Sequence, residues 1–316
     1  MHVMASSAVS LAELEECFEE QRAALTGYCY RMLGSPFDAD DAVQEAFIRA
    51  WRGVERFEGR SALRSWLYRI ATNVCIDMAA GRQRRARPMD LGPAQEPLVE
   101  HLNTRVEATW IEPMPDPADV AVSRESVRLA FVAALQQLPP RQRAALILCE
   151  VLQWQATEAA ELLETSVASV NSALQRARAT LASADRQPPA GDIDEELLSR
   201  YVAAFEAYDI ERLTSIIHAD AVQSMPRYDL WLAGRSDIFT WWLGPGAGCR
   251  GSRVLPAGRA NGSAAFAQYK PDPGGGYEPW ALQVLETSAG RVTELTFFLD
   301  AERLFPLFGL PARLDA

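Results

Sequence analysis

The stretch RFEGRSALRSWLYRIATNVCIDMAAGRQRR, residues 56–85, decides the fold of the first part of this chain of 316 residues. From Ser61 to about Gly81 its apolar residues recur at helical spacing, which predicts an amphipathic helix with one buried stripe. The stripe consists of Leu63, Leu67, Ile70, Val74 and Met78. Basic and aromatic residues are interleaved along the same stretch, namely Arg60, Arg64, Trp66, Tyr68 and Arg69. This mixture is typical of surfaces that bind phosphates and unstacked bases.

One flank of the predicted helix carries side chains suited to single-stranded nucleic acid. On a helical wheel Trp66, Asn73 and Asp77 lie within about 40° of one another. The rings of Phe57 and Trp66 can stack on bases, and the amide of Asn73 offers both donors and acceptors. Two alternatives stay open, in which Trp66 is a core aromatic and Asn73 bonds to nearby backbone. Four arginines follow as a cluster able to hold DNA phosphates, namely Arg82, Arg84, Arg85 and Arg87.

The charge of the chain is unevenly distributed. The whole chain carries a net charge of -11, yet residues 48–90 hold ten arginines against four acids. A local basic block in an acidic chain suits a protein that touches nucleic acid with one face and is held there partly by another partner. Since we find no apolar run of membrane-spanning length and no signal peptide, we expect a cytoplasmic protein. The five cysteines and three histidines are scattered, which indicates neither a disulfide framework nor a metal site.

The spacing of apolar residues and of proline predicts a multidomain protein. Residues 1–88 are expected to form an all-helical domain, with helices beginning near Leu11 and at Ser35-Pro36. Residues 89–125 are acidic and rich in proline, as is typical of a linker. Helical spacing resumes over residues 126–187, and residues 188–316 begin with two helices and continue as strands. The fold class is therefore two all-α domains followed by an α+β domain.

The second helical domain contains a helix-turn-helix pattern over residues 157–181. We expect Val167, Val170, Leu174 and Leu181 to face inward. The outward residues of its second helix would be Asn171, Ser172, Gln175, Arg176 and Arg178. Such side chains bond to base edges and phosphates when a helix lies in the major groove, although an ordinary helical hairpin is the alternative.

Two blocks of the sequence resemble known bacterial proteins. SPFDADDAVQEAFIRAW with RFEGRSALRSWLYRIATNVCIDMAAGRQRR resembles region 2 of sigma-70-type factors of the extracytoplasmic-function (ECF) group, and LPPRQRAALILCEVLQWQATEAAELLETSVASVNSALQRARATL is similar to their region 4. The resemblance implies a sigma factor that binds core RNA polymerase, through its beta-prime clamp helices and beta flap, and directs it to promoter DNA. No cofactor and no enzymatic activity are implied.

The resemblance also implies roles for individual residues. The helix bearing Asp41, Gln44, Phe47 and Trp51 would dock on the clamp helices. A pocket for a flipped-out base of the minus-10 element would be formed by Phe57, Gly59, Arg60, Ser61, Trp66 and Asn73. The second helix of the helix-turn-helix would read the minus-35 element. Many family members have basic residues where this chain has Asn171 and Ala173, so the promoter sequence is not predicted.

The last 130 or so residues extend beyond region 4 and resemble the SnoaL-like cone fold. Such cones often enclose a pocket, and seven aromatic residues are candidates to line one: Trp231, Trp241, Trp242, Tyr269, Tyr277, Trp280 and Phe298. His218 and Asp220 are the candidates for a general base, although they follow a helix in an expected surface turn. Gly274-Gly275-Gly276 lacks the Lys-Ser/Thr of a phosphate loop and predicts a tight turn. A regulatory module, a sensor of a small ligand, and an enzyme carrying a DNA-binding arm remain as alternatives.

Overall fold

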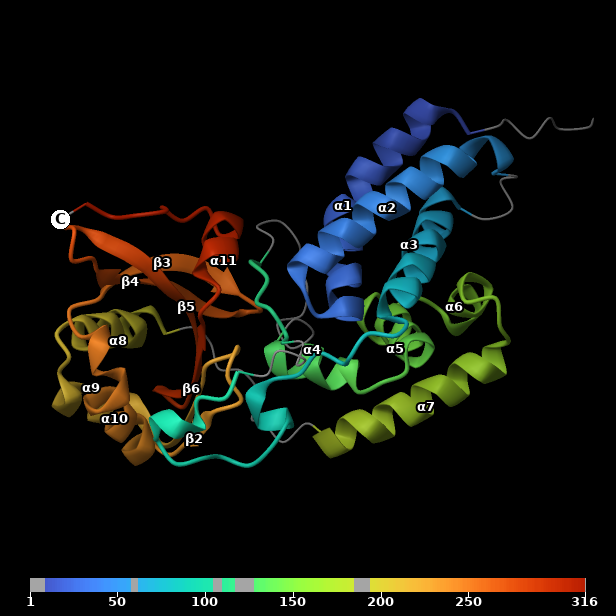
Figure 1. Ribbon diagram of the computed structural model, residues 1–316. Helices are drawn as coiled ribbons and strands as arrows, with labels where there is room; N and C mark the ends of the chain where they lie inside the picture. The colour runs from blue at the N-terminus through green and yellow to red at the C-terminus, as the bar shows by residue number, and fades with distance from the viewer. Residues whose placement is uncertain (1–8, 58–61, 105–109, 117–127, 185–193, 316) are drawn as a thin grey trace, which may run out of the picture. The chain divides into compact units, whose positions relative to one another are not determined.

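The computed structural model describes residues 9–57, 62–104, 110–116, 128–184 and 194–315. The chain divides into two compact units (Figure 1). The helical unit comprises Met1–Arg85 and Pro117–Arg186, and the sheet unit comprises Ala86–Asp116 and Gln187–Ala316. The two all-α parts and the α+β part predicted from the sequence are therefore confirmed.

The first part of the helical unit is built from three helices, α1 (Leu11–Leu33), α2 (Pro36–Gly53) and α3 (Leu63–Ala79), with the short turn η1 (Val54–Arg56) after α2. Ser10 and Glu13 form the predicted capping box at the start of α1. Gly34 ends that helix with φ +74°, a left-handed conformation that glycine adopts without strain. Ser35 then caps α2 through its side chain. The chain therefore reverses within two residues, and α1, α2 and α3 pack on one another.

The second part of the helical unit consists of shorter elements. They are α4 (Leu129–Gln136), α5 (Pro140–Leu146), the π-turn η5 (Ile147–Val151), α6 (Ala156–Leu162) and α7 (Val167–Ala184). Pro139 and Pro140 separate α4 from α5, as predicted. The turn between α6 and α7 contains Glu164 at φ +51°, so the predicted helix-turn-helix is confirmed. Helices α4, α5 and α6 contact α1 and α3, so both parts share one core.

The sheet unit contains six strands, β1 (Ile217–Ser224), β2 (Trp231–Ala233), β3 (Arg253–Ala260), β4 (Ser263–Pro271), β5 (Tyr277–Ser288) and β6 (Arg291–Phe298). They form one sheet in the order β2-β1-β6-β5-β4-β3. The pair β1 and β6 is parallel, and every other pair is antiparallel. His218 and Asp220, expected in a surface turn, lie in β1.

Helices cover both faces of this sheet (Figure 1). One face packs on α8 (Glu195–Glu206), α9 (Ile210–Ile216) and α10 (Arg235–Leu243), which is followed by η6 (Pro245–Cys249). The opposite face packs on α11 (Ala301–Leu307), where the ring of Phe305 lies 5.1 Å from that of Tyr269. Successive residues of a strand point to opposite faces of the sheet, so alternate residues of β4 contact the helices on one face and on the other.

The segment predicted as a linker is largely part of the sheet unit. Residues 86–116 are called the connector below. Its described residues, 86–104 and 110–116, contain the turns η2 (Pro88–Asp90) and η3 (Val99–His101) and pack on the sheet; residues 105–109 and the remainder of the predicted linker, 117–125, lie outside the described residues. Proline prevents regular helix here, but it leaves the backbone groups of the intervening residues free to bond to the edge of a sheet.

Candidate nucleic-acid and polymerase interface

The aromatic pair predicted for the minus-10 element is assembled at the start of α3. Trp66 is only 9% exposed, which agrees with the alternative that it is a core aromatic residue. Its ring lies 5.0 Å from that of Phe57, which is half-buried at the end of η1. Trp66 therefore packs against the Phe57 ring, and little of the Trp66 ring itself is accessible to a base. Gly59, Arg60 and Ser61, predicted for the same pocket, lie outside the described residues.

Asn73 lies two turns further along α3 and is exposed. Within the described part of the chain its side chain makes no hydrogen bond, so the alternative of a local backbone bond finds no support. Asp77, one turn beyond, forms an ion pair with Arg49 of α2 at 3.1 Å. This exposed pair joins α2 and α3 on the flank that presents Asn73.

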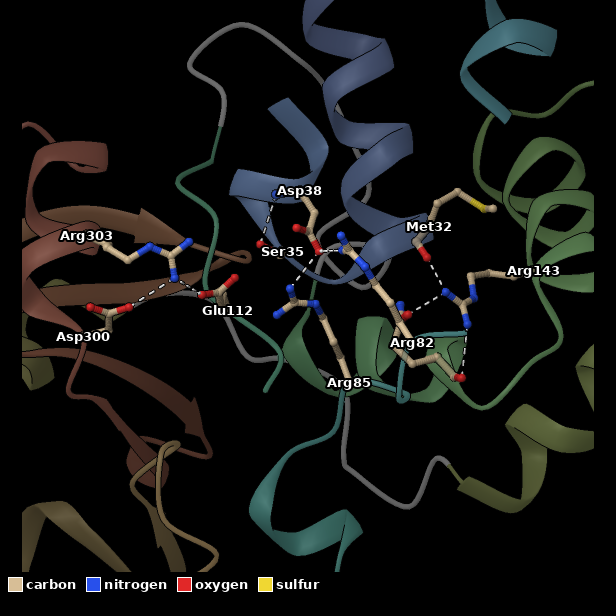
Figure 2. Close-up of polar contacts among 10 residues, drawn as sticks. Met32, Ser35, Asp38, Arg82, Arg85, Glu112, Arg143, Asp300 and Arg303 are labelled. Atoms are coloured by element: carbon tan, nitrogen blue, oxygen red, sulfur yellow. Dashed lines mark hydrogen bonds and ion pairs between the residues drawn. The ribbon is translucent and has the colours of Figure 1, made fainter. Parts of the chain in front are cut away.

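The predicted arginine cluster is divided between the two units. Asp38, in the first turn of α2, accepts hydrogen bonds from Arg82 at 3.0 Å and from Arg85 at 2.8 Å (Figure 2). Arg84 is exposed. Arg87 belongs to the sheet unit, where it pairs with Asp90 at 3.1 Å. Burial alone would lower the pKa of Arg87, but the nearby carboxylates, including Glu294 and Glu286 of the sheet, raise it above its usual value.

The four arginines predicted to hold phosphates differ in how exposed they are. Arg85 and Arg87 are each more than half buried in ion pairs, so DNA would have to compete with carboxylates for them. Arg82 is about half exposed despite its bond to Asp38. The open part of the cluster is therefore Arg82 and Arg84.

The basic and aromatic face of α3 contacts the second part of the helical unit. The ring of Tyr68 lies 5.1 Å from that of Trp154, and the guanidinium of Arg64 lies 5.4 Å from the Trp154 ring. Arg69 lies 3.8 Å from the carboxylate of Glu164, in the turn of the helix-turn-helix. Sequence reasoning missed these contacts, because nothing local in the sequence pairs residues so far apart along the chain.

Helix α7 presents the residues predicted for the minus-35 element. Asn171, Gln175, Arg176 and Arg178 are exposed, and Ser172 is half-buried. Arg176 donates a hydrogen bond to Ser172 at 2.6 Å, and Arg178 donates one to Glu150. Three residues anchor the opposite side of the helix in the core: Val170, Leu174 and Ala177.

Val167 is a correction to the predicted inward face of this helix. It is 38% exposed and is the first residue of α7. Leu181, near the other end, is half-buried.

Helix α2 presents the residues predicted to bind core polymerase. Asp41 and Gln44 are exposed, and Trp51 is 51% exposed. Phe47 is half-buried, with its ring 4.5 Å from that of Phe18 in α1. Sequence reasoning missed Ile48, an exposed apolar residue. Its spacing of four from Gln44 and three from Trp51 was the signal that could have found it.

The aromatic residues predicted to line a pocket in the sheet unit are only partly correct. A cavity of about 230 Å³ is lined by Trp241, Trp242 and Trp280. The other four predicted residues, which are Trp231, Tyr269, Tyr277 and Phe298, do not line this cavity. Phe297 lines it in place of Phe298, because adjacent residues of β6 point to opposite faces of the sheet. His218 and Asp220 do not line it either; the His218 side chain is 43% exposed and that of Asp220 94% exposed.

Comparisons with known proteins agree with this arrangement. The sequence matches Sigma-70 region 2 over residues 17–85 and Sigma-70, region 4 over residues 128–181. The ECF RNA polymerase sigma factor SigG of Mycobacterium tuberculosis is 46% identical over 311 residues, which cover 94% of this chain and 83% of that protein. SigJ of the same species is 31% identical over 208 residues, which cover 64% of this chain and 62% of that protein.

The chain belongs to the ECF RNA polymerase sigma factors. In this sigma factor region 2 comprises α1, α2 and α3, and region 4 comprises α4 to α7. The crystal structure of the Mycobacterium tuberculosis ECF sigma factor SigJ shares its fold with a TM-score of 0.62 and 22% identity, covering 94% of this chain and 99% of that one. The sheet unit has the two starting helices and the later strands expected from its resemblance to the SnoaL-like cone fold, and it is called the SnoaL-like domain below.

Family membership establishes the general activity of the protein. It binds core RNA polymerase and promoter DNA, and it directs transcription initiation. Within the described residues, no helix is long and apolar enough to cross a membrane.

Proposed function

We propose that this sigma factor uses three separate surfaces during initiation. Asp41, Gln44, Phe47 and Trp51 of α2, joined by Ile48, would bind the clamp helices of the polymerase beta-prime subunit, and region 4 would contact the beta flap. The exposure of this side of α2 and its uncovered Trp51 support the assignment.

The two DNA-binding surfaces lie on α3 and α7. Phe57 and Asn73, together with the loop that carries Gly59, Arg60 and Ser61, would hold an unstacked base of the minus-10 element, and Arg82 and Arg84 would contact the adjoining phosphates. The exposed amide of Asn73 and the ring pair of Phe57 with Trp66 support this. The exposed side of α7 would read the minus-35 element in the major groove.

The SnoaL-like domain would regulate these surfaces from within the same chain, without catalysis, in the cytoplasm where polymerase acts. The observation that carries this proposal is that the domain holds the connector between region 2 and region 4. Asn261, at the β3–β4 turn, exchanges hydrogen bonds with Met114: its backbone N–H donates to the Met114 carbonyl at 3.0 Å, and its side-chain oxygen accepts from the Met114 N–H at 2.9 Å. The N–H of Gly262 donates to Asp116 at 2.9 Å.

Further contacts hold the connector along its length. The indole N–H of Trp231 donates to the carbonyl oxygen of Gly92 at 2.9 Å, and the N–H of Gln95 donates to the carbonyl oxygen of Trp231 at 3.0 Å. Near its other end, Glu112 accepts a hydrogen bond from Arg303 of α11 at 3.0 Å (Figure 2). The contacts therefore include both halves of the connector.

Holding the connector restricts how far region 2 and region 4 can separate. A free segment of this length could extend over about 100 Å, at 3.3 Å or so per residue. A sigma factor engaged with promoter DNA must place its two DNA-binding regions on elements that lie well apart. Because the attached connector cannot extend, its release from the SnoaL-like domain would favour the extended, polymerase-bound form.

The test is to release the connector in the full-length chain. A variant combining Glu112→Ala, Asp116→Ala and Trp231→Phe removes three of its attachments, and a control combining Glu302→Ala, Asp237→Ala and Tyr277→Phe changes similar residues of the same domain that lie outside the cavity. We expect the release variant to be cleaved faster by protease between residues 88 and 125. We also expect it to give more run-off transcript with core polymerase from the promoter upstream of its own gene.

Two results would contradict the proposal. Faster cleavage with unchanged transcription would show that the connector does not control activity. Turnover of a small molecule by the SnoaL-like domain, with transcription indifferent to both variants, would favour the enzyme alternative.

A further inference from the structure

The cavity of the SnoaL-like domain is enclosed mainly by aromatic rings. It lies among α8, α10, η6 and strands β1, β4, β5 and β6. The rings that line it belong to Phe205, Tyr208, Tyr228, Trp241, Trp242, Trp280 and Phe297. A dry cavity of about 150 Å³ is enough to hold benzene, so about 230 Å³ accommodates one or two fused rings. The walls therefore suit a planar apolar body.

The polar groups at the cavity include the amide of Gln223. Gln223 is 2% exposed, and its side-chain oxygen accepts a hydrogen bond from the indole N–H of Trp242 at 2.7 Å. That bond fixes the amide, whose nitrogen donates no hydrogen bond within the described residues. The amide nitrogen is therefore available to donate a hydrogen bond to a ligand that supplies an acceptor.

Lys270 adds a positive charge to the same cavity. Its ammonium nitrogen lies 3.0 Å from the centroid of the Trp280 ring, and Cys249 lies beside it on the cavity wall. Lys270 is the single lysine of a chain with 31 basic residues. Among the described residues that line the cavity there is no aspartate or glutamate. The positive charge is thus left without a carboxylate inside the cavity.

We propose that this cavity binds a small aromatic carboxylate. The rings of Trp241 and Trp242 would pack on its aromatic body, the ammonium of Lys270 would pair with its carboxylate, and the amide nitrogen of Gln223 would donate a hydrogen bond to one of its oxygens. A neutral molecule of the same shape would form no ion pair with Lys270, so the site discriminates by charge as well as by shape.

One wall of the cavity comes from the connector. Leu102, just after η3, lines the cavity, and so does Tyr228. The connector is joined to this wall by a bridge between Thr104 and Tyr228 and by a hydrogen bond from the N–H of Asp229 to the carbonyl oxygen of Asn103 at 3.2 Å. A ligand in the cavity would therefore contact the connector between region 2 and region 4 and change how firmly it is held. This consequence rests on the proposed regulatory function.

Binding is tested on the full-length chain with two probes of matched shape, 2-naphthoate and the neutral 2-naphthamide, by calorimetry and by quenching of tryptophan fluorescence. We expect saturable binding of 2-naphthoate, and at least tenfold weaker binding of 2-naphthamide. Lys270→Met should remove this preference, whereas Lys270→Arg should keep most of it. The control Arg200→Met removes an exposed positive charge from α8 outside the cavity and should bind both probes as the native chain does.

A second readout follows from the single lysine. Because Lys270 carries the only side-chain amine, 2-naphthoate should slow its modification by an amine-reactive reagent, as measured by mass spectrometry of the peptide that contains it. Absence of saturable binding, or equal affinity for the two probes in the native chain, would overturn the proposal.

The effect of the ligand on the connector is tested separately. We expect Leu102→Ala to weaken binding of 2-naphthoate, and 2-naphthoate to change cleavage of the connector by protease. If 2-naphthoate bound without changing cleavage of the connector, the proposed effect on the connector would be wrong and the binding site would stand. The release variant tests the regulatory function without either probe, so failure of that proposal can be distinguished from failure of the proposed binding site.

Discussion

The guanidinium of Arg143, in α5 of region 4, donates a hydrogen bond to the carbonyl oxygen of Met32, in the last turn of α1 of region 2 (Figure 2). It also donates to the carbonyl oxygens of Gln136 and Leu138, each at 3.1 Å. Gln136 in turn donates to the carbonyl oxygen of Arg31 at 3.1 Å. The last carbonyls of a helix lack partners within the helix and carry partial negative charge, so a buried guanidinium is well placed there.

Arg143 should therefore hold region 4 against region 2. Burial lowers its pKa to about 10, so it stays charged at neutral pH. Arg143→Met keeps the apolar stem but leaves the carbonyl of Met32 without this donor, at a cost of about 1.5–3 kcal/mol for a bond to a charged group. We expect a larger radius of gyration in small-angle scattering and more run-off transcript.

Arg141→Met is the matched control, because Arg141 is exposed on the same helix. It should change neither the radius nor the transcript. If Arg143→Met lowered the melting temperature but left the radius as in the native chain, the residue would stabilise region 4 alone, and the interpretation would be wrong.

Trp154 should limit access of single-stranded DNA to α3. It packs on Tyr68 and Arg64, which belong to the stretch predicted to bind unstacked bases. A cation–π contact of this kind contributes about 0.5–2 kcal/mol, so Trp154→Ala should strengthen binding of the free protein to a single-stranded oligonucleotide by about two- to thirtyfold. Fluorescence anisotropy measures this. Trp51→Ala removes an exposed tryptophan elsewhere and should have no effect; weaker binding by Trp154→Ala would show that Trp154 itself contacts DNA.

Phe57 and Asn73 should be needed for opening promoter DNA but not for binding core polymerase. Loss of stacking or of hydrogen bonds to one base costs about 1–3 kcal/mol, so Phe57→Ala and Asn73→Ala should each reduce open-complex formation about ten- to hundredfold. Glu55→Ala, an exposed change near Phe57, serves as the control. Normal open complexes in both variants would sink the assignment of this pocket.

Docking and promoter reading should separate between α2 and α7. Gln44→Ala combined with Phe47→Ala should weaken association with core polymerase, but Phe47 also packs on Phe18, so part of that loss would be structural. Trp51→Ala is cleaner, because its ring is exposed, and should weaken association about tenfold. Arg176→Ala should spare association and reduce dependence on the minus-35 element. Unchanged promoter discrimination by Arg176→Ala would mean that α7 is not the reading helix.

The sequence was informative wherever the decisive interactions are local. The cap at Ser10, the proline break at Pro139 and the turn of the helix-turn-helix depend on neighbouring residues, and all three were predicted correctly. Predicting which residues line the cavity required knowing which residues of each strand point to which face of the sheet. An error of one residue in β6 placed Phe298 in the cavity instead of Phe297. Irregularities in register, such as the one between Gln268 and Tyr269, make that parity impossible to count from the sequence.

The ion pairs of the arginine cluster and the docking of the connector could not be predicted for a different reason. Asp38 and Arg85 are far apart in the chain, as are Met114 and Asn261. Neither pair has a local signature, because each depends on how whole elements pack. A composition rich in proline and acids predicts only that a segment lacks regular structure, and leaves open what it packs on.

Binding of 2-naphthoate should weaken as the pH rises toward the alkaline range. Burial lowers the pKa of Lys270 below its ordinary value of 10.5, although the nearby Cys249 thiol and Glu278 oppose the shift. The ammonium therefore loses its proton at a lower pH than a free lysine does, and the charge that pairs with the carboxylate is lost with it. Affinity should be constant near neutral pH, fall as Lys270 deprotonates, and remain high to a more alkaline pH in Lys270→Arg, because a guanidinium stays protonated there. If binding instead weakened equally over the same pH range in the native chain and in Lys270→Arg, that result would remove Lys270 from the site.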